Sequence, residues 1–265
     1  MSNKLLEKLT PMPTRLSRRD LLGFAAKGAA SVVVSQSLLL SCASGAVGAT
    51  DTSGTSDGTT TTPTTGNATC VLTAALTEGP YFVDEMLNRS DIRTDTVTGA
   101  VSSGIPLTLT FNVSRVANSA CTPLTGAYLD VWHCDAGGVY SDVSGSSRKF
   151  LRGYQITDAN GVAAFTTIYP GWYSGRAVHI HFKLRLFAGS TKTYEFTSQF
   201  FMDDTLSDTV YTLSPYNTRG TRNTRNANDG IYNNLSSTDK AGLTLQTSKT
   251  TDGYAGVINL GVTVG

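Results

Sequence analysis

Two histidines separated by a single residue, His179 and His181, are the side chains in this sequence best suited to bind a metal ion together. Apolar and polar residues alternate through 178–187, which is the pattern of a β-strand. Because side chains alternate across a strand, both imidazoles project from one face and can converge on one ion. The chain has only three histidines. The alternative is a pair of histidines on a solvated strand face.

Tyrosines near the histidine pair are the candidates for further ligands. No carboxylate lies beside the pair, so the arrangement of two histidines and one carboxylate is not indicated. Tyr169 and Tyr173 precede the pair, and a phenolate is a hard anionic ligand suited to ferric iron. A trivalent cation lowers the pKa of tyrosine far below its usual value of about 10. Two imidazoles and two phenolates on Fe(III) leave a net charge of about +1 and room for a bidentate ligand.

The segments that must position these residues are predicted to be β-strands. Runs rich in β-branched and aromatic residues, bounded by Gly, Pro, Asn or Asp, predict a series of strands. They lie at 106–113, 127–132, 161–168, 178–187, 193–201 and 257–264. Since no long segment has the period of an amphipathic helix, we expect an all-β fold over residues 69–265. The predicted fold is a β-sandwich of mostly antiparallel strands with long loops and few short helices.

The first 42 residues have the pattern of an export signal. Arg18 and Arg19 precede a moderately apolar stretch of small residues, which is typical of a twin-arginine signal. Lys27 and scattered serines argue against the alternative of a membrane-anchoring helix. Residues 43–68 are almost wholly small and polar and predict a flexible linker. We therefore expect a protein exported to the periplasm, the cell surface or the medium.

The four cysteines fit an exported protein. Residues 39–42 resemble a bacterial lipobox, in which Cys42 would carry a lipid anchor to the membrane. Cleavage after residues 47–49 is the alternative. Cys70 and Cys121 lie at the edges of strand-like runs and are expected to form a disulfide, as an oxidising compartment allows. Cys134 has apolar neighbours and predicts a buried free thiol.

Composition excludes several classes of protein. With 40% hydrophobic and 15% charged residues, the chain of 265 residues is not disordered, collagen-like, a coiled coil or a multi-span membrane protein. Six of the 21 basic and two of the 20 acidic residues lie in the first 42, so the remainder carries a net charge of about −3. Such a domain has no bulk attraction to phosphate, and we expect no nucleic-acid partner.

Several motifs occur in a fixed order between residues 78 and 201. They are Glu78-Gly79-Pro80-Tyr81-Phe82, the segment 132–140 that ends in Tyr140, Leu151-Arg152-Gly153, the turn at 157–161, and the run 165–181. In this order they resemble the intradiol ring-cleavage dioxygenases. These are the non-haem ferric catechol and protocatechuate dioxygenases and their exported relatives.

The resemblance implies four ligands for a non-haem Fe(III) ion. They are Tyr140, Tyr173, His179 and His181, with Tyr173 and His181 axial and the other two equatorial. Tyr173 is preferred to Tyr169 because the ligand of the family follows a Pro-Gly turn, whereas Tyr169 precedes it. Tyr169 is then expected to serve packing.

The resemblance also implies an activity: a catechol-type diol and O2 react to give a cis,cis-muconate-type product. Tyr173 would act as the base, and Arg176 would stabilise the negative charge that develops on the ring. Gln199 matches a supporting glutamine of the family. Without a role in the site, Arg176 would form a surface salt bridge and Gln199 would be an ordinary strand residue. For the whole domain, the alternative is a non-catalytic cell-surface sandwich that binds aromatic or glycan ligands.

Two features depart from the pattern of the family's soluble members. The loop between Tyr173 and His179 is shorter, which predicts a more open pocket, and the N-terminal helical dimerisation segment is replaced by the signal and linker. Three arginines later in the chain, Arg219, Arg222 and Arg225, either rim the site or lie in a solvated loop, the second reading being favoured.

Overall fold

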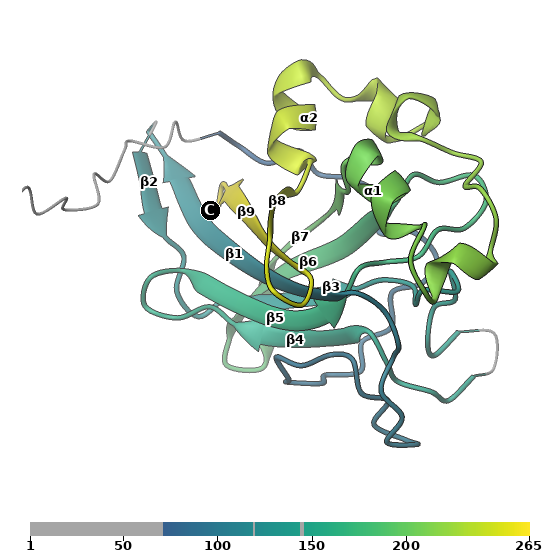
Figure 1. Cartoon of the computed structure of the whole chain (residues 1–265). Helices are drawn as coiled ribbons and strands as arrows, with labels where there is room; N and C mark the ends of the chain where they lie inside the picture. Colours follow the sequence, from purple (N-terminus) through teal and green to yellow (C-terminus); the bar gives the residue numbers. More distant parts are fainter. Residues whose placement is uncertain (1–70, 119, 144–145) are drawn as a thin grey trace, which may run out of the picture. The chain divides into compact units, whose positions relative to one another are not determined.

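The computed structural model describes residues 71–118, 120–143 and 146–265 (Figure 1). The predicted signal, linker and lipobox, together with Cys42 and Cys70, lie outside the described residues. Within the described ranges, no helix is both long and apolar enough to span a bilayer.

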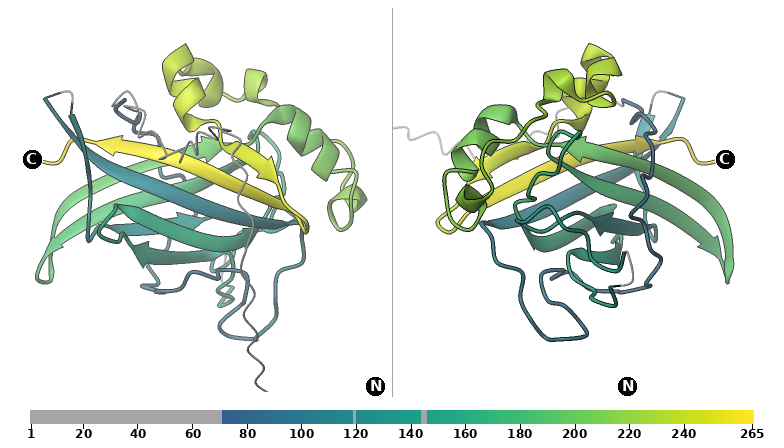
Figure 2. Two further views of the ribbon diagram at one scale, coloured as in Figure 1. Left: turned by 60° about the vertical axis from the view of Figure 1, so that its left-hand side comes forward. Right: turned by 90° about the vertical axis from the view of Figure 1, so that its right-hand side faces the viewer.

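Two β-sheets packed face to face form the described part of the chain (Figures 1 and 2). The first has the order β2-β1-β9-β8, with β5 also paired to β1, and the second has the order β4-β3-β6-β7. The first contains β1 (Pro106–Ala117), β2 (Ala120–Pro123), β5 (Val162–Ile168), β8 (Gln246–Lys249) and β9 (Tyr254–Val262). The second contains β3 (Tyr128–Trp132), β4 (Arg152–Ile156), β6 (His179–Ala188) and β7 (Thr191–Phe201). Apart from the parallel pair β1–β9, the strand pairs are antiparallel, which confirms the predicted all-β sandwich.

Each of the six predicted runs corresponds to a strand, and the sequence pattern missed β2, β4 and β8. β2 is exposed along its whole length and β8 is polar, so neither has the alternation that marks a half-buried strand. Two seven-residue helices, α1 (Asp204–Val210) and α2 (Ser237–Leu243), follow β7 with three short 3-10 turns between them. Both helices lie on the same side of the sandwich (Figure 2).

Phe111 on β1 lies at the centre of the core between the sheets. Its ring centroid is 5.9 Å from that of Phe165, 6.0 Å from that of Phe182 and 5.8 Å from that of Phe200. Phe165 belongs to the same sheet as Phe111, whereas Phe182 and Phe200 belong to the other. These four buried rings therefore tie the sheet that carries the histidine pair to the sheet behind it.

Both faces of β6 are buried, although the sequence pattern separates an apolar face from a polar one. Ile180, Phe182 and Leu184 belong to the hydrophobic core. Lys183 and Arg185, which share the other face with the histidines, are each 4% exposed. A buried Lys or Arg requires a partner, so this polar face must be covered rather than solvated.

Residues 78–86, called here the covering segment, lie over the polar face of β6. Lys183 pairs with Glu78 of this segment and lies 4.2 Å above the ring of Phe82. Arg185 pairs with Asp84 of the segment and, at 2.8 Å, with Asp130 of β3. These ion pairs and the cation–π contact fix the covering segment beside the histidine pair.

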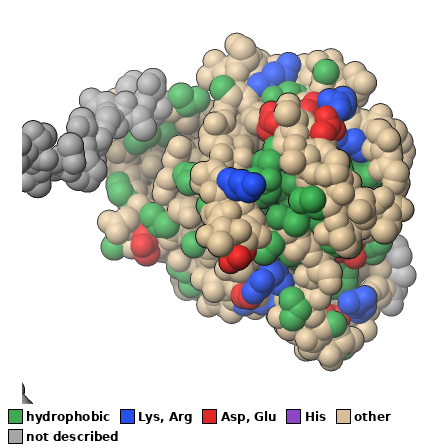
Figure 3. All heavy atoms as spheres, viewed as in Figure 1, with side chains coloured by type: hydrophobic (Ala, Val, Ile, Leu, Met, Phe, Trp, Pro, Cys, Tyr) green, Lys and Arg blue, Asp and Glu red, His purple; other side chains and the backbone are tan. Residues whose placement is uncertain are grey.

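On the face drawn in Figure 3, side chains of opposite charge are interspersed rather than gathered by sign. This face therefore presents no single-sign field to a highly charged partner.

Replacing Phe111 by Ala is expected to reduce the free energy of unfolding by about 3–5 kcal/mol, because a large ring is removed from between the sheets. Urea denaturation measures the change. Val257→Ala on β9 is the control, since Val257 is 44% exposed and its loss costs little. Equal losses in the two variants would contradict the central role of Phe111.

Candidate metal centre

The structure brings the four candidate ligands together at one end of β6. The Nε2 atoms of His179 and His181 are 3.0 Å apart, and the Tyr173 hydroxyl is 3.1 Å from Nε2 of His179. The ring centroid of Tyr140 lies 5.8 Å from that of Tyr173 and 6.3 Å from that of His181. A regular strand thus provides both histidines, and two loops provide the tyrosines.

The two imidazoles are buried and neutral. Nδ1 of His179 donates to the carbonyl oxygen of Ala177 at 2.6 Å, which leaves a lone pair on Nε2. Burial lowers the pKa of His179 to about 3 and that of His181 well below its usual value. Neutral imidazole is the form that binds a metal ion, so both histidines are already in the protonation state that metal binding requires.

The two tyrosines need a cation in order to ionise. The Tyr140 hydroxyl is buried and has no hydrogen-bond partner among the described residues. Burial raises the pKa of Tyr140 well above its usual value and that of Tyr173 to about 12. A bound trivalent cation reverses this tendency, because it stabilises the phenolate directly. The unpartnered hydroxyl of Tyr140 and the adjacent Nε2 atoms of the two histidines therefore fit a ferric ion.

A metal ion at this site would depend on the tyrosines as ligands. In the ranges that the structure describes, no group of three or more His, Cys, Asp or Glu side chains is placed to hold a metal ion. The donor set at the end of β6 is instead two nitrogens and two phenolic oxygens, which are harder and more anionic than imidazole alone. Such a set favours Fe(III) over softer divalent ions.

Aromatic stacking and a close glycine fix the ring of His181. Trp132, which pairs with His181 in the register of β3 and β6, stacks on the imidazole with centroids 5.0 Å apart and planes inclined by 7°. Gly79 of the covering segment has φ +71°, and a Cβ there would lie 3.3 Å from Cε1 of His181. Tyr81 of the same segment stacks on Tyr140 at 4.4 Å. The covering segment thus supports two of the four candidate ligands.

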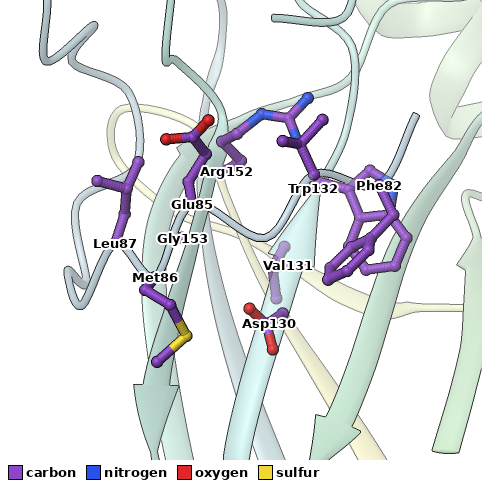
Figure 4. Close-up of a pocket in the computed structure, with 10 residues that line it drawn as sticks. Phe82, Glu85, Met86, Leu87, Asp130, Val131, Trp132, Arg152 and Gly153 are labelled. Carbon is purple, nitrogen blue, oxygen red and sulfur yellow. The ribbon is translucent and has the colours of Figure 1, made fainter. Parts of the chain in front are cut away.

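A cavity of about 480 Å³ opens beside Tyr140 and Tyr173, and Tyr81, Val143 and Phe150 also line it. This volume lies in the range of small-molecule pockets. A second cavity of about 10 Å³ is lined by Trp132 and by Phe82, which lies beside it (Figure 4). The second cavity has room for about one water molecule, so it is no substrate pocket.

Arg176 and Gln199 meet at the edge of the centre. Nη1 of Arg176 is 3.5 Å from Nε2 of His179, and Nη2 donates to the amide oxygen of Gln199. Gln199 pairs with His181 in the register of β6 and β7. Arg176 is partly buried in an ion pair with Asp229 and is not a surface salt bridge.

Tyr169 is fully buried elsewhere in the core, where its hydroxyl and that of Ser207 are 2.7 Å apart. It takes the packing role expected of it. His133 is also buried and satisfied, with Nδ1 2.8 Å from the Cys134 carbonyl and Nε2 2.6 Å from the Thr167 hydroxyl.

The expectation of a solvated arginine loop is wrong for Arg222. Arg222 is 6% exposed and pairs with Asp204 and Asp208, because α1 places both carboxylates within its reach. Arg225 is exposed and pairs with Asp208. Arg219 lies 4.6 Å above the ring of Trp172.

Among the cysteines, Cys134 is a buried free thiol, as predicted. Cys121 is in a disulfide. Its predicted partner Cys70 lies outside the described residues, so that pairing stays a prediction.

Comparison with known proteins gives the family. A family model described as "Dioxygenase" matches residues 77–212. An intradiol ring-cleavage dioxygenase from Tetranychus urticae is 30% identical, with a TM-score of 0.62 over 73% of this chain and 95% of that one. The chain belongs to the intradiol ring-cleavage dioxygenase family. It is therefore related to oxidoreductases that cleave aromatic rings.

Other solved structures extend the comparison. The dioxygenase domain of a dioxygenase carbohydrate-binding protein fusion from Streptomyces sp. SirexAA-E is 27% identical, with a TM-score of 0.52 over 74% of this chain and all of that one. A hydroxyquinol 1,2-dioxygenase from Pseudomonas putida DLL-E4 is 17% identical over 73% of this chain and 67% of that one, with a TM-score of 0.51, which supports the fold alone. A search of curated protein sequences gives no match.

Sequence reasoning missed several residues that support the centre of this family member. Gly79 and Tyr81 carried part of the family resemblance, but nothing in the sequence placed them against His181 and Tyr140. Trp132 lies in a predicted strand, yet its contact with His181 depends on strand pairing. Asp229 stands in a polar loop of Asn, Asp and Gly, where no local signal separates it from a surface residue.

Gly79→Ala is expected to reduce the iron retained per chain, because the added methyl presses on His181 and the backbone strains at φ +71°. Gly99→Ala is the matched control. Its φ is +75°, and a Cβ there meets nothing within 4 Å. Both variants lose roughly 1 kcal/mol of stability from backbone strain, and only Gly79→Ala loses iron. Equal iron contents after loading, measured by metal analysis, would contradict the contact with His181.

Proposed function

We propose that this protein is an exported non-haem Fe(III) intradiol dioxygenase that cleaves catechol-type diols with O2 to cis,cis-muconate-type products. The observation that carries the proposal is the convergence of two imidazoles and two phenols beside an open pocket. Family membership supports the same reaction. A site that had lost its function would usually have lost one of these groups, which argues against a non-catalytic binding domain.

Tyr140, Tyr173, His179 and His181 would hold the iron, and the bound ion would make the chelated diol reactive toward O2. Tyr173 is the group that accepts a proton from the diol. Its hydroxyl belongs to a partly exposed side chain that lines the pocket, so an incoming hydroxyl can reach it. Tyr140 is 4% exposed and held by Tyr81, which suits a ligand that stays in place.

Arg176 supplies positive charge at the edge of the pocket. Its guanidinium lies next to the histidine pair and is oriented by hydrogen bonds to Asp229 and Gln199 before any substrate arrives. A preorganised charge of this kind stabilises negative charge as it develops on the ring, without a cost of reorganisation during the reaction.

Export is part of the proposal. The paired arginines followed by an apolar stretch support the twin-arginine route. The disulfide of Cys121 supports an oxidising compartment. Lipidation of Cys42 would keep the domain at a membrane surface, on the linker of residues 43–68.

Tyr173→Phe is expected to lower kcat for catechol about 10²- to 10⁴-fold, the range for loss of a general base. O2 uptake and the absorbance of the muconate product measure turnover of the iron-loaded protein. The control is Tyr169→Phe, which removes a buried hydrogen bond to Ser207 and costs about 1 kcal/mol of stability. It leaves kcat unchanged. An unaltered kcat in Tyr173→Phe would overturn the role given to Tyr173.

A further inference from the structure

Asp229 reaches the metal centre from a loop more than fifty residues further along the chain than Arg176. It lies between the 3-10 turns η2 (Asn226–Asn228) and η3 (Tyr232–Asn234) and has no exposed surface. One carboxylate oxygen, Oδ2, accepts from Nε of Arg176 at 2.8 Å and from the backbone N–H of Ala177 at 2.8 Å. The other, Oδ1, accepts from the backbone N–H groups of Ile231 and Tyr232 at 2.8 and 2.9 Å.

The carboxylate of Asp229 is held in its ionised form. Burial acts to raise its pKa, but the N–H groups of Tyr232 and Ala177 and the Arg176 guanidinium outweigh burial and hold the pKa below its usual value. A carboxylate with four donors and no contact with solvent is a fixed negative charge beside the centre.

The contacts of Arg176 show what this charge does. Its guanidinium makes three contacts: Nε with Asp229, Nη2 with Gln199, and Nη1 with Nε2 of His179 at 3.5 Å. Asp229 is the charged partner among the three. A free arginine side chain samples many rotamers, so holding one orientation needs a strong partner.

The same carboxylate acts on a histidine. Asp229 binds the N–H of Ala177, and the carbonyl oxygen of Ala177 accepts from Nδ1 of His179. Asp229 therefore anchors Ala177 through its N–H, and the carbonyl group on the other side of the same residue sets the hydrogen on His179. A group that hydrogen-bonds to a metal-binding histidine in this way orients the ring and fixes its tautomer.

We propose that Asp229 is a positioning residue that fixes Arg176 and His179 together at the metal centre. This inference rests on the proposed function, since it assigns Asp229 a part in the same reaction. Asp229 balances the charge of Arg176 and leaves the guanidinium aimed at the place where the ring of the diol becomes negative.

The test is Asp229→Asn in the full-length, iron-loaded protein. The amide keeps the size of the side chain but removes the charge and turns one acceptor into a donor. The expected result is a fall in kcat of about 10- to 100-fold, as for other outer partners of metal ligands, with KM for catechol changed less than about 3-fold. In a double-mutant cycle, Asp229→Asn lowers kcat less in the presence of Arg176→Gln than it does alone, because only its action through His179 remains.

Asp91→Asn is the control, because the ion pair of Asp91 with Arg93 involves neither a candidate ligand nor the loop that carries Asp229. It is expected to cost stability and to leave kcat unchanged. Full kcat in Asp229→Asn, additive losses in the cycle, or the same fall in the control would each overturn the positioning role. Absence of turnover in the wild-type protein would overturn the proposed function and this role with it.

If Asp229→Asn does not fold, Arg176→Lys tests whether the orientation of Arg176 matters. Lysine keeps the charge but lacks the planar guanidinium group, which contacts Asp229 and Gln199 at the same time. Its kcat is expected to fall about 10-fold or more, with a nearly unchanged dissociation constant for catechol in anaerobic titration. Wild-type kcat in Arg176→Lys would show that orientation of Arg176 is unimportant and would overturn the proposal.

Discussion

A cluster of buried donor atoms at one end of β6 is the constraint on which the rest of this structure depends. Two neutral imidazoles direct nitrogens toward one another at 3.0 Å, and the Tyr140 hydroxyl beside them has no hydrogen-bond partner among the described residues. An unsatisfied buried polar group costs about 1–3 kcal/mol. One bound metal ion would satisfy these donor atoms together and make their burial favourable.

The surrounding structure supplies the rigidity that such a cluster needs. The histidines stand on a strand that is buried on both faces, so neither ring can turn away to water. Lys183 and Arg185 extend the same face and hold the covering segment in place through ion pairs. The loop that carries Asp229 binds Arg176 and Ala177, which lie just before the histidine strand. Stability of the sandwich and geometry of the centre are thus provided by the same elements.

A residue of this site can be predicted from the sequence when its role depends on close neighbours along the chain, and not when it depends on a distant segment. The alternation around His179 and His181 places both rings on one face, because strand periodicity is local. Tyr173 and Tyr140 were assigned by family resemblance, since no local pattern distinguishes Tyr173 from Tyr169. Asp229 was not predicted, because its role arises from a contact between distant segments. The strands β2 and β8 were missed for a related reason: they are exposed and owe their pairing to neighbours.

The most direct test of this account is the visible spectrum of the full-length protein supplied with ferric iron, with the iron quantified, before and after catechol is added without oxygen. The account predicts a coloured protein with about one iron per chain and a tyrosinate-to-iron absorption band that moves to longer wavelength with catechol. A protein that binds no iron and stays colourless would contradict the claim that these four side chains form a ferric centre.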